Sequence, residues 1–147
     1  VSTVRAIQAA DISVIGNFIF GLPGDTKDSM QRTLDLALEL KCEWANLYPA
    51  MAFPGSKLYE KALANGWRLP KSWAGYAPLG YECVPLETET LTSEQVLFFR
   101  DMAFMTYFGD PQYLEMIWQQ FGSAAGIDIL DMMAVGPPER KILDGEK

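Results

Sequence analysis

Residues 16–26 read GNFIFGLPGDT, an apolar segment that runs into a turn of glycine and proline and then into a predicted helix. Residues 12–20 are almost continuously apolar and rich in β-branched side chains, which is typical of a parallel strand covered on both faces. The turn places backbone N–H groups and the Asp25 carboxylate at the carboxyl end of that strand, where α/β folds bind ligands. The stretch therefore predicts a small-molecule site, although a sharp turn with Asp25 or Thr26 as a helix cap is the simpler interpretation.

The pattern that follows predicts a second unit of the same kind. A helix is expected over residues 27–41, a strand over 44–51 that ends in a Pro-Gly turn, and a helix from Ser56 to Asn65. This order predicts two parallel strands joined by a right-handed crossover. Because two parallel strands do not make a stable sheet alone, we expect partner strands upstream of Val1 and interpret the chain as a fragment.

The second half of the chain changes character. Residues 67–91 combine prolines with large aromatic side chains, which predicts an ordered loop that either lines a substrate cavity or, as we favour, packs against the domain. Helices are expected after Thr92, which begins a capping box, and from Asp110 to Gly122, with a short helix near 127–133. The aromatic residues of the loop are Trp67, Trp73, Tyr76 and Tyr81.

The content of the chain excludes several classes of function. With 147 residues, a net charge of −7 and no basic cluster, it does not match nucleic-acid-binding proteins. It has no histidine, which excludes Ser-His-Asp and Cys-His catalysis and histidine zinc sites within it. Cys42 and Cys83 lack metal-ligand spacing and are expected to be buried thiols of a cytoplasmic protein. No apolar run is long enough to span a membrane, and no signal peptide is visible.

Charged residues late in the chain are expected to be structural or exposed. Arg100 and Asp101 lie within an apolar helical pattern, which favours a structural ion pair over a catalytic role. The charged tail that ends at Lys147 is expected to fray, as chain ends commonly do.

Three stretches of the sequence resemble one known family. They are GNFIFGLPGDT, MAFPGSKLYE at residues 51–60, and WRLPKSWAGYAPLGYECVPLETETLTSEQVLFFRDMAFMTYF at residues 67–108. Their order and spacing are similar to those of the C-terminal half of the radical S-adenosylmethionine (radical SAM) barrel, in the branch that carries a cobalamin-binding domain. The resemblance implies an α/β fold, with the C-terminal βα units of a partial TIM-like barrel over residues 1–68 and a mostly α-helical extension over residues 69–147.

The same resemblance implies the chemistry of a longer parent, an iron–sulfur oxidoreductase or methyltransferase that acts on a small-molecule substrate. In that family a 4Fe-4S cluster on a CxxxCxxC loop reduces SAM. This chain lacks the motif, so we expect no metal ligand, no catalytic residue and no activity in the chain alone. The upstream half of the barrel is the expected partner, and cobalamin, where used, would lie on an upstream domain.

The resemblance also implies that the chain supplies one wall of the SAM site. Aligned on Gly21, the family's GxIxGxxE strand matches at Ile19, whereas Asn17 replaces its first glycine and Gly24 stands where the acidic residue should be. Asp25, one position later, matches a variant of the pattern. The implied cofactor-binding residues are Asn17, Ile19, Gly21, Pro23 and Asp25, with Tyr48 and Met51 nearby.

Two other interpretations stay open at this point. The strand ends could bind a phosphate or nucleotide in another parallel α/β barrel, although the turn lacks the Lys and Ser/Thr of a P-loop. Alternatively, the helices predicted over residues 92–133 could form an autonomous interaction module. A CxxxCxxC motif roughly 100 residues upstream, about half a barrel, would decide for radical SAM.

Overall fold

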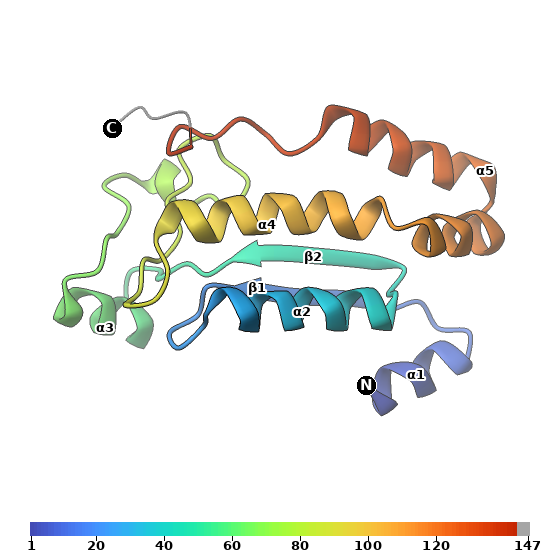
Figure 1. Ribbon diagram of the computed structural model, residues 1–147, viewed down its shortest axis with the longest axis horizontal. Coiled ribbons are helices and arrows are strands. Elements are labelled where there is room, and N and C mark those ends of the chain that lie inside the picture. The colour runs from blue at the N-terminus through green and yellow to red at the C-terminus, as the bar shows by residue number, and fades with distance from the viewer. Residues whose placement is uncertain (144–147) are drawn as a thin grey trace.

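The structure is a computed structural model, and it describes residues 1–143 (Figure 1). It has a mixed α/β fold, with two parallel strands and five α-helices among the described residues. The elements are α1 (Ser2–Ala9), β1 (Ile15–Phe20), α2 (Lys27–Leu40), β2 (Trp44–Pro49), α3 (Lys57–Asn65), the 3-10 helix η1 (Trp73–Tyr76), α4 (Ser93–Phe108) and α5 (Pro111–Val135). The order of strands and helices predicted for the first half is confirmed.

β1 and β2 pair as parallel strands along their whole lengths. β1 begins at Ile15, so the prediction of a strand over residues 12–20 is wrong for the residues before Ile15. The backbone N–H of Val14 donates to the Glu43 carboxylate at 2.7 Å, and the N–H of Ile12 donates back to α1. These two donors are therefore satisfied outside the strand ladder, which accounts for the later start of β1.

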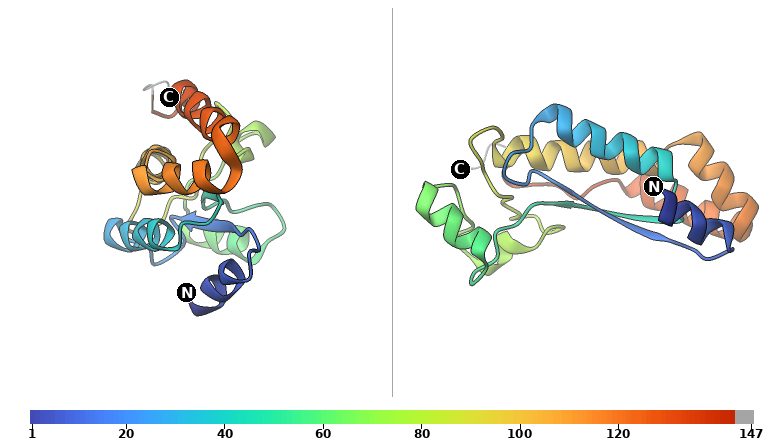
Figure 2. Two further views of the ribbon diagram at one scale, coloured as in Figure 1. Left: turned by 90° about the vertical axis from the view of Figure 1, so that its right-hand side faces the viewer. Right: turned by 90° about the horizontal axis from the view of Figure 1, so that it is seen from below.

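The two faces of the sheet have different surroundings. On one face α2 and α4 run side by side along the sheet (Figure 1, Figure 2) and bury the side chains of Phe18, Phe20, Ala45 and Leu47. On the opposite face Ile15 is 61% exposed and Ile19 is 46% exposed. The prediction that β1 is covered on both faces is therefore wrong within the described residues. We call this second side the bare face; it carries Ile15, Asn17, Ile19, Trp44, Asn46 and Tyr48.

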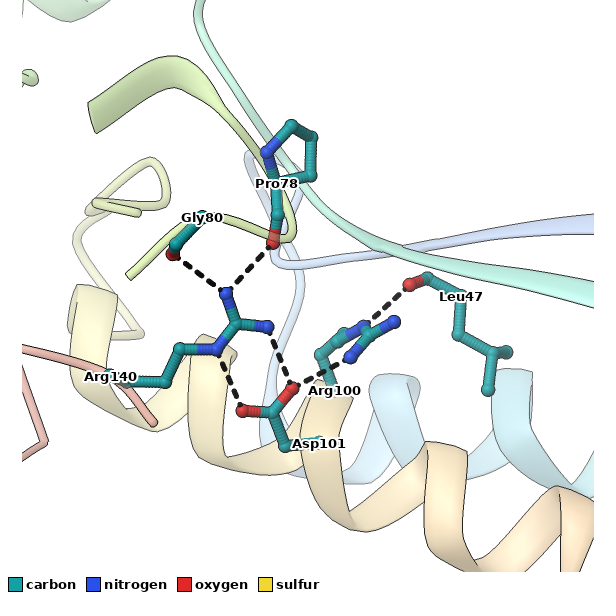
Figure 3. Close-up of polar contacts among 6 residues, drawn as sticks. All are labelled: Leu47, Pro78, Gly80, Arg100, Asp101 and Arg140. Carbon is teal, nitrogen blue, oxygen red and sulfur yellow. Dashed lines mark hydrogen bonds and ion pairs between the residues drawn. The ribbon is translucent and has the colours of Figure 1, made fainter. Parts of the chain in front are cut away.

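The two edges of the sheet also differ. The N–H of Ala50 donates to the carbonyl of Phe20 and so points toward β1. In a parallel ladder only every second residue points its N–H and C=O to the partner strand, so those of Leu47 and Pro49 point away from β1. Proline has no N–H to donate, and the carbonyl of Leu47 accepts a hydrogen bond from the Arg100 guanidinium at 2.7 Å (Figure 3). At the outer edge of β2, α4 thus occupies the Leu47 carbonyl, whereas the outward peptide groups of β1 have no hydrogen-bond partner among residues 1–143.

The helices of the second half begin at the predicted caps. Thr92 caps α4 in a capping box, and the Asp110 side chain caps α5. The backbone of α5 is interrupted at Gly122, where φ is 84°, so the predicted break at this residue is confirmed. The part of α5 after the break is longer than the helix expected near residues 127–133. Among the described residues, no helix combines the length and the apolar content that crossing a membrane requires.

A buried cluster of three charged residues joins α4 to the C-terminal segment (Figure 3). Asp101 accepts a hydrogen bond from Arg100 at 2.8 Å and two from Arg140 at 3.1 and 3.2 Å. All three residues are buried. The predicted ion pair between Arg100 and Asp101 is confirmed, and Arg140 is the partner that local sequence patterns do not reveal. We call these residues the Arg100–Asp101–Arg140 cluster.

The same cluster fixes the C-terminal segment on the aromatic loop. Arg140 also donates to the carbonyls of Pro78 and Gly80, at 3.2 and 2.9 Å. The N–H of Lys141 donates to the carbonyl of Tyr81 at 3.0 Å. The expectation of a frayed tail is therefore wrong for Arg140 and Lys141, because a buried ion pair and backbone hydrogen bonds hold them. The last residues to which that expectation applies, 144–147, lie outside the described residues.

Candidate functional site

The turn between β1 and α2 is held by Asp25. Its carboxylate accepts hydrogen bonds from the backbone N–H groups of Gly21 and Leu22, both at 3.0 Å, and from the Ser29 hydroxyl at 2.6 Å. Thr26, rather than Asp25, is the N-cap of α2. The Asp25 carboxylate is thus engaged within its own turn, and it satisfies the backbone donors that an anionic ligand would otherwise contact.

The two glycines of this turn have different surroundings. Gly21 has a φ of +85°, and a Cβ atom placed on it would lie 2.6 Å from the Val96 side chain of α4. Gly24 has a φ of +91° and nothing within 4 Å of the same position. Both therefore need the left-handed backbone that glycine adopts freely, but only Gly21 is also enclosed by a neighbouring helix.

Several predicted site residues lie together on the bare face. The amide of Asn46 donates to the side-chain oxygen of Asn17 at 3.0 Å, so adjacent strands present a pair of amides. Toward the carboxyl ends of the strands, Ile19 and Tyr48 stand opposite each other in the ladder. Ile19 is largely exposed and Tyr48 is half-buried. This part of the bare face offers amide donors and acceptors, a phenol and an apolar surface to a molecule placed against it.

Pro23 and Met51 lie in the segments that follow the two strands, and both are half-buried. β2 ends at Pro49, so Met51 lies beyond the strand and not within it as predicted. The N–H of Ala50 donates to the carbonyl of Phe20 at 2.7 Å and joins the two strand ends. The predicted site residues are thus distributed over two adjacent strands and the segments that follow their carboxyl ends.

A comparison with known proteins adds an observation that the fold alone does not supply. Over 114 residues this sequence is 25% identical to an uncharacterized methyltransferase from Pyrococcus horikoshii. The chain is similar to a methyltransferase. The match covers 78% of this chain and 24% of the relative, so the chain spans about a quarter of the relative's length. No protein-family model matches the chain.

The two cysteines are free and buried, as predicted. Burial raises the pKa of the Cys83 thiol to about 11 and also raises the pKa of the Cys42 thiol. Both are therefore neutral thiols near pH 7, whereas metals and clusters bind the thiolate. Within residues 1–143, no group of three or more histidine, cysteine, aspartate or glutamate side chains is placed to hold a metal ion.

We expect Cys42 and Cys83 to resist alkylation in the native chain. The pKa of Cys83, raised from 9.0 to about 11, lowers its thiolate fraction about 100-fold, the raised pKa of Cys42 acts in the same direction, and burial slows access to both. Mass spectrometry after iodoacetamide treatment near neutral pH should show little modification until urea is added. A Ser72→Cys variant, which places a thiol at an exposed position, should react rapidly in the native chain and provides the control. Rapid native modification of Cys42 or Cys83 would contradict their burial.

The aromatic loop mainly contributes packing. Tyr76 is buried, and its ring lies 5.9 Å from the ring of Phe53, which follows β2. Trp67 contacts a second small hydrophobic cluster made by Ala50, Ala52, Ala62 and Leu86. Trp73 is largely exposed, although its ring lies 5.8 Å from that of Tyr76. The favoured interpretation of the loop as packing therefore fits Trp67 and Tyr76.

Sequence reasoning missed one cavity next to the bare face. It has a volume of about 300 Å³, lies between β2, α4 and the segment after α5, and is lined by Arg100. The segments that enclose it are far apart in the sequence, so no local pattern predicts the cavity. The one available signal was the position of a charged residue within the apolar run FFRDMAF. Another cavity, of about 380 Å³, lies at the amino ends of the strands beside Ile15 and Trp44, away from the strand-end turns.

Proposed function

We propose that the chain is the C-terminal part of an S-adenosylmethionine-dependent methyltransferase of the radical SAM class. In this proposal the carboxyl half of the bare face and the adjoining turn form one wall of the SAM site. The observation that carries it is the similarity to a methyltransferase over most of the chain, joined to the position of the predicted site residues on two adjacent parallel strands. Ligands of α/β folds bind at such strand ends.

The described residues fit a wall of this kind. Asn17 and Asn46 can exchange hydrogen bonds with polar groups of the cofactor, and exposed Ile19 can cover an apolar part of it. Asp25 acts indirectly, because its carboxylate holds the turn in shape through Gly21 and Leu22. The bound cofactor would supply an activated methyl group. The residues of this chain bind and orient it, and the bare face excludes water from one side.

The described residues do not fit a 4Fe-4S cluster. Cluster ligation needs closely spaced thiolates, whereas Cys42 and Cys83 are separate buried thiols with raised pKa values. If the parent protein holds a cluster, its ligands therefore come from outside residues 1–143. We likewise assign no cobalamin ligand to these residues.

The proposal includes the upstream half of the barrel as the partner of this chain. Within the described part of the chain, residues 1–143, the outward peptide groups of β1 have no partner, and the bare face exposes Ile15 and Ile19. An added parallel strand would pair with these peptide groups of β1. A closed or partial barrel would enclose Ile15 and Ile19. A small-molecule substrate would then meet the cofactor inside the enclosed space.

The phosphate or nucleotide alternative loses support from the turn itself. A phosphate site at a strand-end turn depends on free backbone N–H groups. Here the N–H groups of Gly21 and Leu22 already donate to Asp25. The turn is therefore closed by its own carboxylate, which would also repel a phosphate.

The experiment that tests the proposal is a binding measurement on the full-length protein. We expect Asn17→Ala to weaken SAM binding about three- to tenfold in calorimetry, the effect of losing one or two hydrogen bonds. Asn65→Ala, an exposed asparagine at the end of α3, is the matched control and should leave the dissociation constant unchanged. Equal effects of the two substitutions, or the absence of a CxxxCxxC motif in the coding sequence upstream of Val1, would contradict the assignment.

A further inference from the structure

The cavity of about 300 Å³ beside β2 combines an apolar wall with one charged group. Aromatic and aliphatic residues from three parts of the chain line it, and Trp44 and Asn46 of the bare face are among them. At about 30 Å³ for each water-sized unit, it has room for roughly ten such units, which is the size of a small organic molecule. The other lining residues are Ala45, Leu47, Tyr48, Leu79, Arg100, Phe104, Phe108, Met132, Gly136, Pro137 and Pro138.

Arg100 is the one charged residue among the described residues that line this cavity. The chain has 19 acidic residues and a net charge of −7, yet none of the described acidic side chains lines it. The cavity therefore has the opposite electrostatic character to the chain as a whole.

The charge of Arg100 is only partly compensated. The Arg100–Asp101–Arg140 cluster contains two guanidinium groups and one carboxylate, so it carries one excess positive charge. Arg140 takes both oxygens of Asp101, and Arg100 shares one of them. A buried cation without a full partner is costly in free energy, so the site gains from an added anion.

One nitrogen of Arg100 is left for that anion. Its Nε donates to the Leu47 carbonyl and its Nη1 donates to Asp101, whereas Nη2 makes no hydrogen bond with any residue from 1 to 143. Figure 3 shows the remaining nitrogen pointing away from Asp101. The guanidinium is held in place by its other contacts, including the Phe104 ring 5.3 Å from its Cζ. Arg100 is thus a preorganised donor at the wall of an apolar cavity.

We propose that this cavity binds a small organic acid, with an aromatic or aliphatic body against the rings of α4 and a carboxylate against Arg100. The cavity shares Asn46 and Tyr48 with the bare face but includes no residue of the turn held by Asp25, and an acid held by Arg100 is no part of the proposed SAM site, so the inference goes beyond the proposed function. A neutral ligand of the same shape fills the apolar part but leaves the charge of Arg100 uncompensated. A cationic ligand of that shape is repelled.

The test uses the 147-residue chain and two probes of the same shape, 3-phenylpropanoate and its neutral amide, 3-phenylpropanamide. Ligand-observed NMR should give a dissociation constant in the millimolar range for the acid, as expected for a ligand of this size. The acid should bind about tenfold more tightly than the amide. Equal affinities, or no binding of the acid at millimolar concentration, would overturn the proposal.

Two variants show whether the acid occupies this cavity. Arg100→Met should remove the preference for the acid over the amide, although it also removes a buried partner of Leu47 and Asp101. Leu79→Trp avoids that risk, because Leu79 lines the cavity and is 56% exposed, so the larger side chain obstructs the site with the fold intact. Leu63→Trp is the matched control, since Leu63 is 58% exposed on α3 and lies outside the cavity. Unchanged acid binding in Leu79→Trp, or equal losses in both tryptophan variants, would place the ligand elsewhere.

Discussion

Asp101→Asn is expected to lower the free energy of unfolding by about 3 to 5 kcal/mol, the range measured when one partner of a buried ion pair is removed. Asp101 is the single carboxylate between two buried arginines, and it accepts three hydrogen bonds from them. Asparagine keeps the size of the side chain but brings an N–H₂ group to guanidinium donors and leaves two cations without a counter-charge. Urea unfolding followed by circular dichroism measures the loss, with the slope of the transition checked for constancy.

Glu94→Gln is the matched control for Asp101→Asn. Glu94 pairs with Arg68 at 2.7 Å, and both side chains are well exposed, at 40% and 45%. Exposed ion pairs contribute about 0 to 1 kcal/mol, so this change from acid to amide should have little effect. A loss below about 1 kcal/mol for Asp101→Asn would contradict the assignment of the cluster as the connection between α4 and the C-terminal segment.

Gly21→Ala is expected to lower the free energy of unfolding by about 2 to 4 kcal/mol. A left-handed backbone costs a non-glycine residue about 1 to 2 kcal/mol, and the new Cβ atom would also overlap the Val96 side chain. Gly24→Ala has the same backbone cost, but its new Cβ would lie in open space. It should therefore lower the free energy of unfolding by the backbone cost alone. The difference between the two variants measures how closely α4 approaches the turn.

A double variant separates the two causes. Val96→Ala removes the two methyl groups nearest to the new Cβ of Gly21→Ala and leaves the Val96 Cβ position at 3.2 Å, so the two substitutions together should cost less than the total of their separate effects. Strict additivity would mean that α4 does not enclose the turn. Equal losses for Gly21→Ala and Gly24→Ala would lead to the same conclusion.

Local signals in the sequence predicted the elements well, because their causes are local. The caps Thr92 and Asp110 and the break at Gly122 depend on a few neighbouring residues. The strand signal was less complete. Apolar content alone did not show that residues 12–14 are held by α1 and Glu43, or that one face of the sheet is bare. Both depend on contacts formed or missing at a distance.

The proximity of the candidate site residues was partly predictable, but their contacts were not. The sequence predicted two adjacent parallel strands that both end in Pro-Gly turns, with Tyr48 near Ile19. In the structure these two residues are opposite each other in the ladder. The role of Asp25 was not predictable, because the same sequence pattern fits a carboxylate that binds a ligand and a carboxylate that stabilises its own turn. Arg140 and the cavity beside Arg100 depend on ion pairs and walls formed by distant segments, which no motif encodes.

The difference between the two sheet edges limits how copies of this chain can associate. On the outer side of β2, Arg100 occupies the Leu47 carbonyl and Pro49 offers no N–H, while the outward peptide groups of β1 have no hydrogen-bond partner among residues 1–143. Two copies that join through β1 would form one continuous sheet with a β2 edge at each end, beside α4. Strand addition at those ends is hindered, since Pro49 lacks an N–H and Arg100 already occupies the Leu47 carbonyl. The β2 edge is thereby a poorer template than the β1 edge for the indefinite stacking that leads to fibres.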